Sequence, residues 1–587
     1  MKIPLLLCLL SFLAFTTIAQ TSPQLIKDVL IGKKSSLINE NSSDKNLEAT
    51  VVNGKLIYKA ASGYIAANDT VNKDFEIFVS DGKAEGTKLL KNINPTNQSY
   101  SNGFFTFKNK AFFSAQADRA GQMWVTDGTS EGTKLFKDIV FRRYYNSLNY
   151  PSIIELDTNR FIFAGDSNVT MPSGGQFAFT FLFISDGTEK GTYMLKDFNP
   201  KKIISGTSNA RVGNFAKLNN GKIVFSASTD EFGREVYVTD GTTAGTVLLK
   251  DINPGKPDML LWNDGFTSFH SDGNKVYFFA NNNVTGAELW CSDGTVNGTK
   301  LLKDINEGKP GALKGSSAWE TIDGITYFTA NTAIYGKELY QTNGTTEGTV
   351  LTMDFAKGIA SGLGEEMVQL GKKLLFYGLI DGKTVKLHAY NPVNNKVDSL
   401  TTTYVYHLSR NNMYCEKLYF DSYLISKNLV SNPLAVTDGS IKGTGLILNL
   451  DNPDYSTAQF QFTEKSIFKV GDNLLYGGDN GKNGIELFKI PLCSSFNTLV
   501  NTEESIESLT NSIKISPNPN DGNYAIEFSS NLHQMEYEVL DMTGKIIFQQ
   551  QLNESISNIS QKLPQGIYII HLKNDKIDTY RKLSITK

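Results

Sequence analysis

The phrase DGTxxGT, followed by an apolar segment such as KLLKDI, recurs along this chain at nearly even spacing. Its clearest copies begin at Asp81, Asp127, Asp186, Asp240, Asp293, Asn343 and Asp438. Successive copies start 46 to 59 residues apart, except for the last gap of 95 residues, which spans two periods. A fixed period of this length predicts a repeat architecture in which each unit packs against its neighbours.

Each unit also carries two strand patterns before this phrase, such as KVYFFAN from Lys275 and ELWC from Glu288. Short aromatic and β-branched runs bounded by Gly, Asn and Asp predict strands, and Asp-Gly favours a tight turn between two of them. Weaker copies, KLHAYNP from Lys386 and IELFKIP from Ile485, extend the series. The pattern predicts an all-β chain whose four-stranded sheets form the blades of a β-propeller.

The two ends of the repeat region complement each other. The last unit lacks a KLLKDI-type strand, whereas LIKDVL, residues 25–30, is such a strand standing alone near the N-terminus. We expect this strand to complete the last blade and to close the ring, which removes an exposed sheet edge. The count is nine blades, or eight if one degenerate unit is not a blade.

The chain divides into four parts. An apolar run after Lys2 predicts a signal peptide over residues 1–20, with no transmembrane segment in the mature chain. The propeller is expected over 21–493 and a polar linker over 494–512. Alternating strands with short turns predict a small β-sandwich over 513–587.

The C-terminal part resembles the sorting domain of the type IX secretion system of Bacteroidetes. The residues that carry the resemblance include Pro517, Asn518, Pro519, Gly544 of DMTGK, and Gly566 and Tyr568 of LPQGIY. The resemblance implies recognition by that secretion machinery, removal of the tail, and release or attachment at the cell surface. The repeats resemble the ELWxxDGT family, through ELWCSDGT from Glu288, which implies no particular activity.

The charge balance argues against nucleic acid as a partner, because 57 Lys and Arg stand against 60 Asp and Glu. Behind the signal peptide three cysteines remain, Cys291, Cys415 and Cys493. An odd number leaves at least one without an intramolecular partner. The sequence leaves their pairing open, including a Cys415–Cys493 bridge.

Motifs that suggest chemistry have simpler structural explanations. GTSEG around Ser130 matches a nucleophile elbow, but it lies in a hairpin turn and not between a strand and a helix. The glutamates that open the third strand recur from unit to unit, so we interpret them as scaffold, pairing with lysines of the adjacent KLLKD strand. The turn aspartates and the five histidines lack the clustering of a metal site. We assign no catalytic residue, no metal and no cofactor.

The best candidate for a ligand site is the longest unit, because insertions in repeat proteins map to loops on one face. It contains Arg142, Arg143, Tyr144 and Tyr145. Aromatic residues in loops are typical of carbohydrate- or protein-binding surfaces. We also expected loop positions for Tyr100, Phe104, Phe105, Trp262 and Trp319.

The sequence favours an exported or surface-attached binding or adhesion module with a carbohydrate or protein ligand. One alternative is an extracellular hydrolase or lyase acting on polysaccharide or peptide in the propeller channel. Such an enzyme requires unmatched carboxylates or histidines from several blades. The other alternative is a structural component of the surface or matrix. Fold alone does not decide among them.

Overall fold

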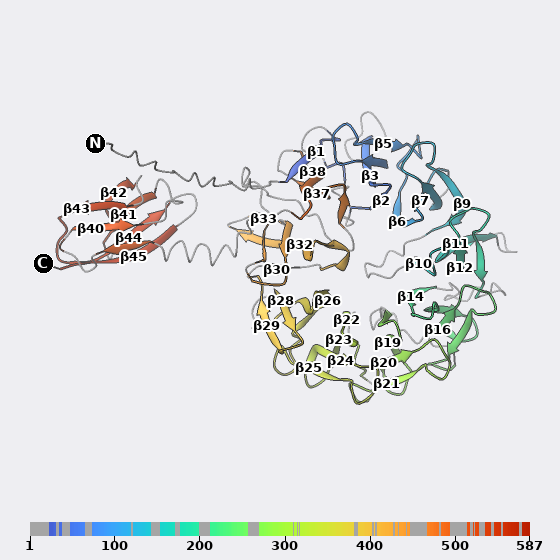
Figure 1. Cartoon of the computed structure of the whole chain (residues 1–587). Helices are drawn as coiled ribbons and strands as arrows, with labels where there is room; N and C mark the ends of the chain where they lie inside the picture. Colours follow the sequence, from blue (N-terminus) through green and yellow to red (C-terminus); the bar gives the residue numbers. More distant parts are fainter. Residues whose placement is uncertain are drawn as a thin grey trace, which may run out of the picture.

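The protein is an all-β structure. The computed structural model describes residues 23–493 and 513–586 with gaps in both parts, the longest at 142–152, 199–211, 256–268 and 447–465. The signal peptide and the linker expected from the sequence lie outside the described residues. Within them, the helical structure is a single 3₁₀ turn, η1 (Arg410–Asn412). Figure 1 shows the sheets from β1 to β38 following one another around a ring.

The ring sheets follow the sequence repeat, and we number the repeat units in chain order. Unit one contains β2 (Ala49–Val52), β3 (Lys55–Tyr64), β4 (Lys73–Ser80) and β5 (Lys88–Lys91). Unit two contains β6 (Asn102–Phe107), β7 (Lys110–Ala115), β8 (Gln122–Thr126) and β9 (Lys134–Val140). Unit three contains β10 (Ile153–Glu155), β11 (Phe161–Thr170), β12 (Gln176–Ser185) and β13 (Tyr193–Lys196). Unit four contains β14 (Gly213–Lys217), β15 (Ile223–Thr229), β16 (Gly233–Thr239) and β17 (Val247–Lys250).

The remaining units continue the same order. Unit five contains β18 (His270–Ser271), β19 (Val276–Asn281), β20 (Ala287–Ser292) and β21 (Lys300–Lys303). Unit six contains β22 (Trp319–Ile322), β23 (Ile325–Thr332), β24 (Gly336–Thr342) and β25 (Val350–Met353). Unit seven contains β26 (Leu363–Leu370), β27 (Lys373–Gly378), β28 (Lys386–Asn391) and β29 (Lys396–Ser399).

The last two units are less regular. Unit eight contains β30 (Tyr404–Val405), β31 (Met413–Tyr414), β32 (Lys417–Ser426), β33 (Leu429–Ser431), β34 (Leu434–Thr437) and β35 (Gly445–Leu446). Unit nine contains β36 (Ile467–Val470), β37 (Asn473–Asp479) and β38 (Ile485–Pro491). Its fourth strand is β1 (Gln24–Lys27), which pairs antiparallel with β38. Units two and three share one sheet because Val140 pairs with Asp166.

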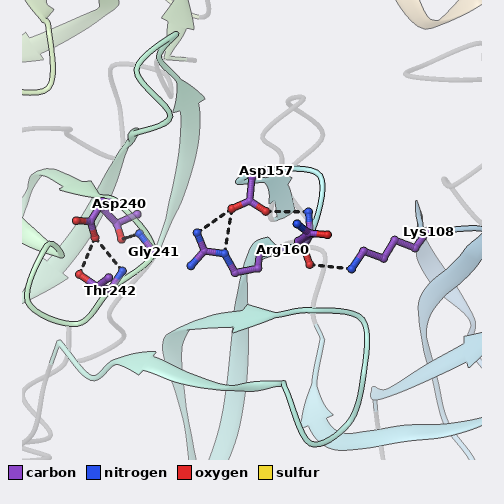
Figure 2. Close-up of polar contacts among 8 residues, drawn as sticks. Lys108, Asp157, Arg160, Asp240, Gly241 and Thr242 are labelled. Carbon is purple, nitrogen blue, oxygen red and sulfur yellow. Dashed lines mark hydrogen bonds and ion pairs between the residues drawn. The ribbon is translucent and has the colours of Figure 1, made fainter.

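The repeated phrase forms the turn between the third and fourth strands, and the polar side chains that recur in it form hydrogen bonds. Asp240 Oδ1 accepts hydrogen bonds from the backbone amide and the hydroxyl of Thr242, at 2.9 and 2.7 Å (Figure 2). The Thr242 hydroxyl in turn accepts from the Gly245 amide at 2.9 Å, and the Thr246 hydroxyl donates to the Thr242 carbonyl at 2.6 Å. The hydroxyls of Thr239 and Thr246 lie 2.8 Å apart and close the turn.

The same bonds recur around the ring. The hydroxyl-to-carboxylate or hydroxyl-to-amide bond of the turn is present at Asp127, Asp186, Asp293, Asn343 and Asp438. In unit one Lys83 replaces the threonine, so only the backbone bond to Asp81 remains. The glycine after the Asp or Asn has φ between 79° and 90° in all seven turns, a conformation that glycine adopts without steric cost.

The cores of the ring lie between neighbouring sheets. One cluster joins Ile57 of unit one to Phe113 of unit two, and further clusters join each following pair of units. A last cluster contains Tyr419 of unit eight, Leu474 of unit nine and Tyr58 of unit one. The side-chain packing therefore returns from the last unit to the first.

Lysines of four fourth strands, Lys27, Lys137, Lys196 and Lys303, each link their unit to the turn of the next unit. Lys196 Nζ donates to the carbonyl of Thr246 at 2.6 Å, and Lys303 Nζ donates to that of Thr349 at 2.7 Å. Lys27 of β1 makes the same bond, at 2.8 Å, with the carbonyl of Thr87 in unit one. By this bond β1 acts as the fourth strand of unit nine.

The cysteine pairing left open by the sequence is resolved. Cys415 and Cys493 form a disulfide that connects the loop after β31 to the chain just beyond β38, with Cα atoms 5.6 Å apart. Cys291 is a free, buried thiol in the core between units five and six.

The C-terminal part consists of two sheets around one core. One contains β39 (Lys514–Ser516), β40 (Asn523–Glu527) and β43 (Ile556–Ser560); the other contains β42 (Ile546–Leu552), β41 (Met535–Leu540), β44 (Gly566–Lys573) and β45 (Asp578–Ile585). Both sheets contribute to a single hydrophobic cluster, as the sandwich prediction requires. Gly566 begins β44, and the Tyr568 hydroxyl donates to the Pro564 carbonyl at 2.9 Å. Pro517, Asn518, Pro519 and Gly544 lie outside the described residues.

The second glycine of the turn leaves no room for a side chain. A Cβ at Gly298 would lie 1.9 Å from Oδ1 of Asp293, so Gly298→Ala must displace a carboxylate held by two hydrogen bonds. We expect a loss of about 1–3 kcal/mol in the free energy of unfolding, measured by chemical denaturation. Gly213→Ala, where a Cβ meets nothing within 4 Å, is the matched control. Equal effects of the two substitutions would contradict this role.

Candidate functional site

The repeated glutamates are structural, as the sequence indicated, but their partners differ from the expected lysines. Glu76, Glu235, Glu288, Glu338 and Glu486 are fully buried. The Glu288 carboxylate accepts hydrogen bonds from the amides of Ile305 and Asn306, at 2.7 and 3.2 Å, just beyond the fourth strand. The lysine of that strand, Lys303, instead bonds the next unit. A carboxylate held between two main-chain amides ends the strand and directs the chain toward the next unit.

In unit nine the N-terminal segment supplies these donors. Glu486 accepts bonds from the amide of Val29 at 3.2 Å, and from the amide and hydroxyl of Ser36 at 2.9 and 2.5 Å. Burial raises the pKa of Glu76, Glu288, Glu338 and Glu486 to about 7, while the hydrogen bonds from backbone amides oppose the rise. These groups are occupied by the scaffold and are not available to a substrate.

The residues proposed from the sequence fall into two groups. Arg142, Arg143, Tyr144 and Tyr145 lie outside the described residues, as does Trp262. The loop positions expected for three other aromatics were wrong. Phe104 and Phe105 belong to β6, where Phe104 stacks on Phe113. Trp319 belongs to β22, is buried, and packs on Phe328 between units five and six. Tyr100 lies outside the strands, as expected, and its side chain is 49% exposed.

A polar group that departs from the repeat lies on the first strands of units five and six. We call His270, Glu320, Thr321 and Arg410 the inner seam. His270 Nε2 lies 2.8 Å from the Thr321 hydroxyl, and its ring stacks on Trp319. Arg410, on η1 of unit eight, places a guanidinium nitrogen 3.3 Å from Glu320 Oε1. Strand β22 thus contacts unit five through Thr321 and unit eight through Glu320.

His270 and Glu320 occupy a strand position that holds an uncharged residue in other units. Glu320 pairs in register with Tyr327, and His270 pairs with the equivalent Tyr277. The same register position holds Thr50 in unit one, Ala216 in unit four and Val368 in unit seven. The sequence signal for this site was present, as an ionisable residue in a position that is otherwise uncharged. Finding it required the strand register, which the repeat phrase alone does not supply.

Burial and the Arg410 charge determine the ionisation of the inner seam. The Glu320 side chain is 5% exposed and that of Arg410 is 58% exposed. Burial raises the pKa of Glu320, and the charge of Arg410 and the Gln369 amide oppose the rise. Burial, with a smaller contribution from Arg410, lowers the pKa of His270 to about 4, so its imidazole is neutral near pH 7. The site offers a buried acceptor, a half-exposed cation and a neutral ring.

No metal site accompanies these groups. Within the part of the chain that the structure describes, no cluster of three His, Cys, Asp or Glu residues is arranged to hold a metal ion. The same described residues contain no helix with the length and hydropathy needed to span a bilayer. The turn aspartates bond their own turns, as in the unit of Asp240.

Comparison with protein families identifies the C-terminal part. Residues 514–586 match the secretion system C-terminal sorting domain. This confirms the sorting-domain assignment of that part, and it indicates a protein that is secreted or located at the cell surface through contact with the secretion machinery. A Bacteroidetes origin stays a prediction. The match covers none of the ring, so the resemblance of the repeats to the ELWxxDGT family stays a prediction.

Comparison with solved structures yields only distant similarity. A Mycobacterium tuberculosis puromycin-hydrolyzing peptidase is 9% identical with a TM-score of 0.33, covering 70% of this chain and 62% of that one. A Pyrococcus horikoshii acylaminoacyl peptidase gives 14% and 0.29, over 69% and 59%. An oligogalacturonate lyase in complex with manganese gives 12% and 0.33, over 68% and 99%. Identities and TM-scores this low indicate nothing about the function of this chain.

The chain spans about three-fifths of the length of the two peptidases. No curated protein matches the sequence.

The raised pKa of the buried glutamates predicts that the stability of the protein depends on pH. Because the folded-state pKa of Glu288 lies above its usual 4.5, the native state holds a proton that the unfolded chain has released. The stability due to this group is therefore present at low pH and is lost as the pH rises through about 7. We expect the stability advantage of the wild type over Glu288→Gln to shrink between about pH 5 and about pH 7.5.

Urea denaturation at a series of pH values measures this difference. The exposed Glu307 provides the control, because Glu307→Gln leaves the buried carboxylate unchanged. A constant difference between wild type and Glu288→Gln across this range would show that the carboxylate does not titrate there.

Proposed function

We propose that residues 23–493 form a closed nine-bladed β-propeller that acts as an exported binding module, and that the C-terminal domain is its removable secretion signal. Three contacts support the closure. β1 pairs with β38, Lys27 bonds Thr87 as the other fourth-strand lysines bond their neighbours, and one core joins units eight, nine and one. The edge that β38 would otherwise expose is covered.

The observation that carries the binding function is the difference between the two faces of the ring. On one face the third and fourth strands are joined by seven residues in seven of the units, as from Ser80 to Lys88 and from Thr342 to Val350, and by four residues in unit seven, from Asn391 to Lys396. On the other face the connections between units differ. Nine residues separate Met353 from Leu363, and twenty separate Leu446 from Ile467. A rigid scaffold with one invariant face and one variable face is suited to recognition through the variable one.

The candidate residues belong to one of these connections between units. It runs from β9, which ends at Val140, to β10, which begins at Ile153. We propose Arg142, Arg143, Tyr144 and Tyr145 as contacts for a carbohydrate or protein ligand. Arg and Tyr combine large contact area with hydrogen-bonding groups, and they are enriched among residues that dominate binding energy.

A second candidate function is favoured by the inner seam. An extracellular hydrolase or lyase acting on polysaccharide or peptide requires ionisable groups that do not recur in every blade, and His270 and Glu320 satisfy this requirement. The seam offers one carboxylate, whereas glycoside hydrolysis generally uses two. We therefore favour binding over turnover.

Closure can be tested by removing β1. Deletion of residues 23–30 is expected to lower the free energy of unfolding by about 3 kcal/mol or more and to cause self-association through the exposed edge of β38. Lys27→Met keeps the strand and loses only the bond to Thr87, so we expect about 1 kcal/mol or less. Denaturation and light scattering measure the two effects. A shortened protein as stable and monomeric as its parent would disprove this form of closure.

Binding can be tested with a glycan array and a cell-binding assay on the purified protein. We expect selective binding that is weakened at least about tenfold when Arg143, Tyr144 and Tyr145 are all changed to alanine. Product analysis of the same incubations detects turnover. Unchanged binding by the variant would move the site elsewhere on the ring. Product formation would favour the enzyme, and no binding would favour a structural component of the surface or matrix.

A further inference from the structure

Three exposed aliphatic side chains lie on the variable face of units five and six. Val284, in the turn between β19 and β20, is 71% exposed, and Ile334, in the turn between β23 and β24, is 67% exposed. Ile359, in the connection between β25 and β26, is 80% exposed. Because the strands of a unit alternate in direction, the turn after the second strand opens on the same face as the connection after the fourth. We call these three side chains the apolar tips.

Contacts between the segments hold the apolar tips in one sector of the face. The backbone that carries Ile359 packs against Gly336, where a Cβ would lie 2.7 Å from the Ile359 carbonyl oxygen. The connection between units five and six contacts the other two turns. Asn306 Oδ1 accepts a hydrogen bond from the Ala333 amide at 3.1 Å, and the Ala312 amide donates to the carbonyl of the first residue of β20 at 2.9 Å.

The apolar character of the tips departs from the repeat. Val284 and Ile334 each stand four residues before the buried glutamate of the third strand. At the same distance from that glutamate, unit four has Glu231 and unit nine has Lys482. A position that other units fill with a charged side chain is therefore aliphatic in two adjacent units, next to Ile359. Single exposed aliphatic residues are ordinary, but a group of them on one face marks an interaction surface.

The turns around the apolar tips can leave water at little cost. Residues 281–286 and 331–336 contain no Asp, Glu, Lys, Arg or His. Asn282 Oδ1 accepts hydrogen bonds from the amides of Val284 and Thr285, both at 2.9 Å. In a lipid phase each polar backbone group must find its partner within the protein, and these two amides already have one.

The side chains beside the apolar tips indicate the class of partner. Tyr335, which follows Ile334, is partly exposed, and Lys357, two residues before Ile359, is exposed. Tyr and Lys combine an apolar body with a polar end, which suits the boundary between a bilayer and water, and a lysine attracts anionic headgroups. A lipid surface requires apolar area without a matching shape, whereas protein partners usually bind through Trp, Tyr and Arg in fitted pockets.

We propose that the apolar tips are a membrane-docking surface, which inserts these three side chains into an anionic phospholipid bilayer. Lys357 and Tyr335 then lie at the level of the headgroups. The three side chains together contain about as much hydrocarbon as one short acyl chain, and a single chain gives reversible binding. The sorting domain brings the protein to the cell surface or beyond it, where it meets bilayers. This inference goes beyond the proposed ligand binding and uses none of the residues 142–145.

The test is sedimentation with large vesicles, of phosphatidylcholine alone and of an equimolar mixture with phosphatidylglycerol. The protein is the chain from residue 21, so that the apolar N-terminal run does not itself bind lipid. We expect binding to the mixed vesicles that is weakened at least about tenfold in the triple variant Val284→Asn, Ile334→Asn, Ile359→Asn, because burying one aliphatic side chain contributes about that factor or more. Lys357→Gln should weaken binding to mixed vesicles about fivefold and leave binding to pure phosphatidylcholine unchanged.

The matched control changes two aliphatic residues of the opposite face. Val296, in the turn between β20 and β21, is 59% exposed, and Val393, in the turn between β28 and β29, is 78% exposed. We expect the double variant Val296→Asn, Val393→Asn to bind vesicles as its parent does. Every substituted side chain is exposed, so the variants should fold, and thermal unfolding checks that they do.

Each outcome decides the inference. Loss of vesicle binding in the triple variant, with the control unchanged, supports it. No vesicle binding by the parent, or equal binding by the parent and the triple variant, overturns it. Self-association of the parent that disappears in the triple variant, without vesicle binding, also overturns it and assigns the apolar tips to a second copy of this chain. The glycan array with the Arg143, Tyr144 and Tyr145 variant judges the proposed ligand binding independently.

Discussion

Five of the units depend on a buried carboxylate that accepts hydrogen bonds from main-chain amides. Glutamate fits this role because its two oxygens can each accept a bond while the longer side chain spans from the third strand to the end of the fourth. The contact fixes the place where one unit ends and the next begins. It also tolerates any side chain at the donor positions, since only backbone groups are used. In unit nine the same requirement is met by Val29 and Ser36, some 450 residues away in sequence.

At the opposite end of each sheet, the turn is stabilised by side chains bonding to their own backbone. The threonine hydroxyls of DGTxxGT donate and accept at once, and a lysine of the preceding unit adds a bond to some of these turns, as Lys196 does to the Thr246 carbonyl. In units one, four, five and six the two ends of the sheet are therefore determined within the unit, one by a carboxylate and one by hydroxyls. Length varies in the connections between units and in the turn between the second and third strands, which has three residues after Thr229 and eight after Tyr64. This division explains why the turn spacing is constant and the repeat spacing is not.

Much of the fold could be predicted from the sequence because the repeat is dictated by local chemistry. Asp-Gly requires a turn wherever it occurs, and LIKDVL resembles the other fourth strands closely enough to predict its pairing. The glutamate partners could not be predicted, because backbone donors leave no mark in the sequence.

The inner seam was missed because its residues come from three units and only the strand register brings them together. The pairing of Cys415 with Cys493 depends on the same kind of long-range geometry. Arg142 to Tyr145 remain a sequence-based proposal.

The disulfide has a mechanical consequence. Cys493 is the last described residue before the linker, and its sulfur is bonded to unit eight. A force applied through the C-terminal domain during transport would otherwise pull on β38 and peel it away from β37 one hydrogen bond at a time. With the bridge in place the load passes at Cys493 to Cys415 of unit eight and bypasses β38. A force on the C-terminal domain therefore does not unfold the ring from β38.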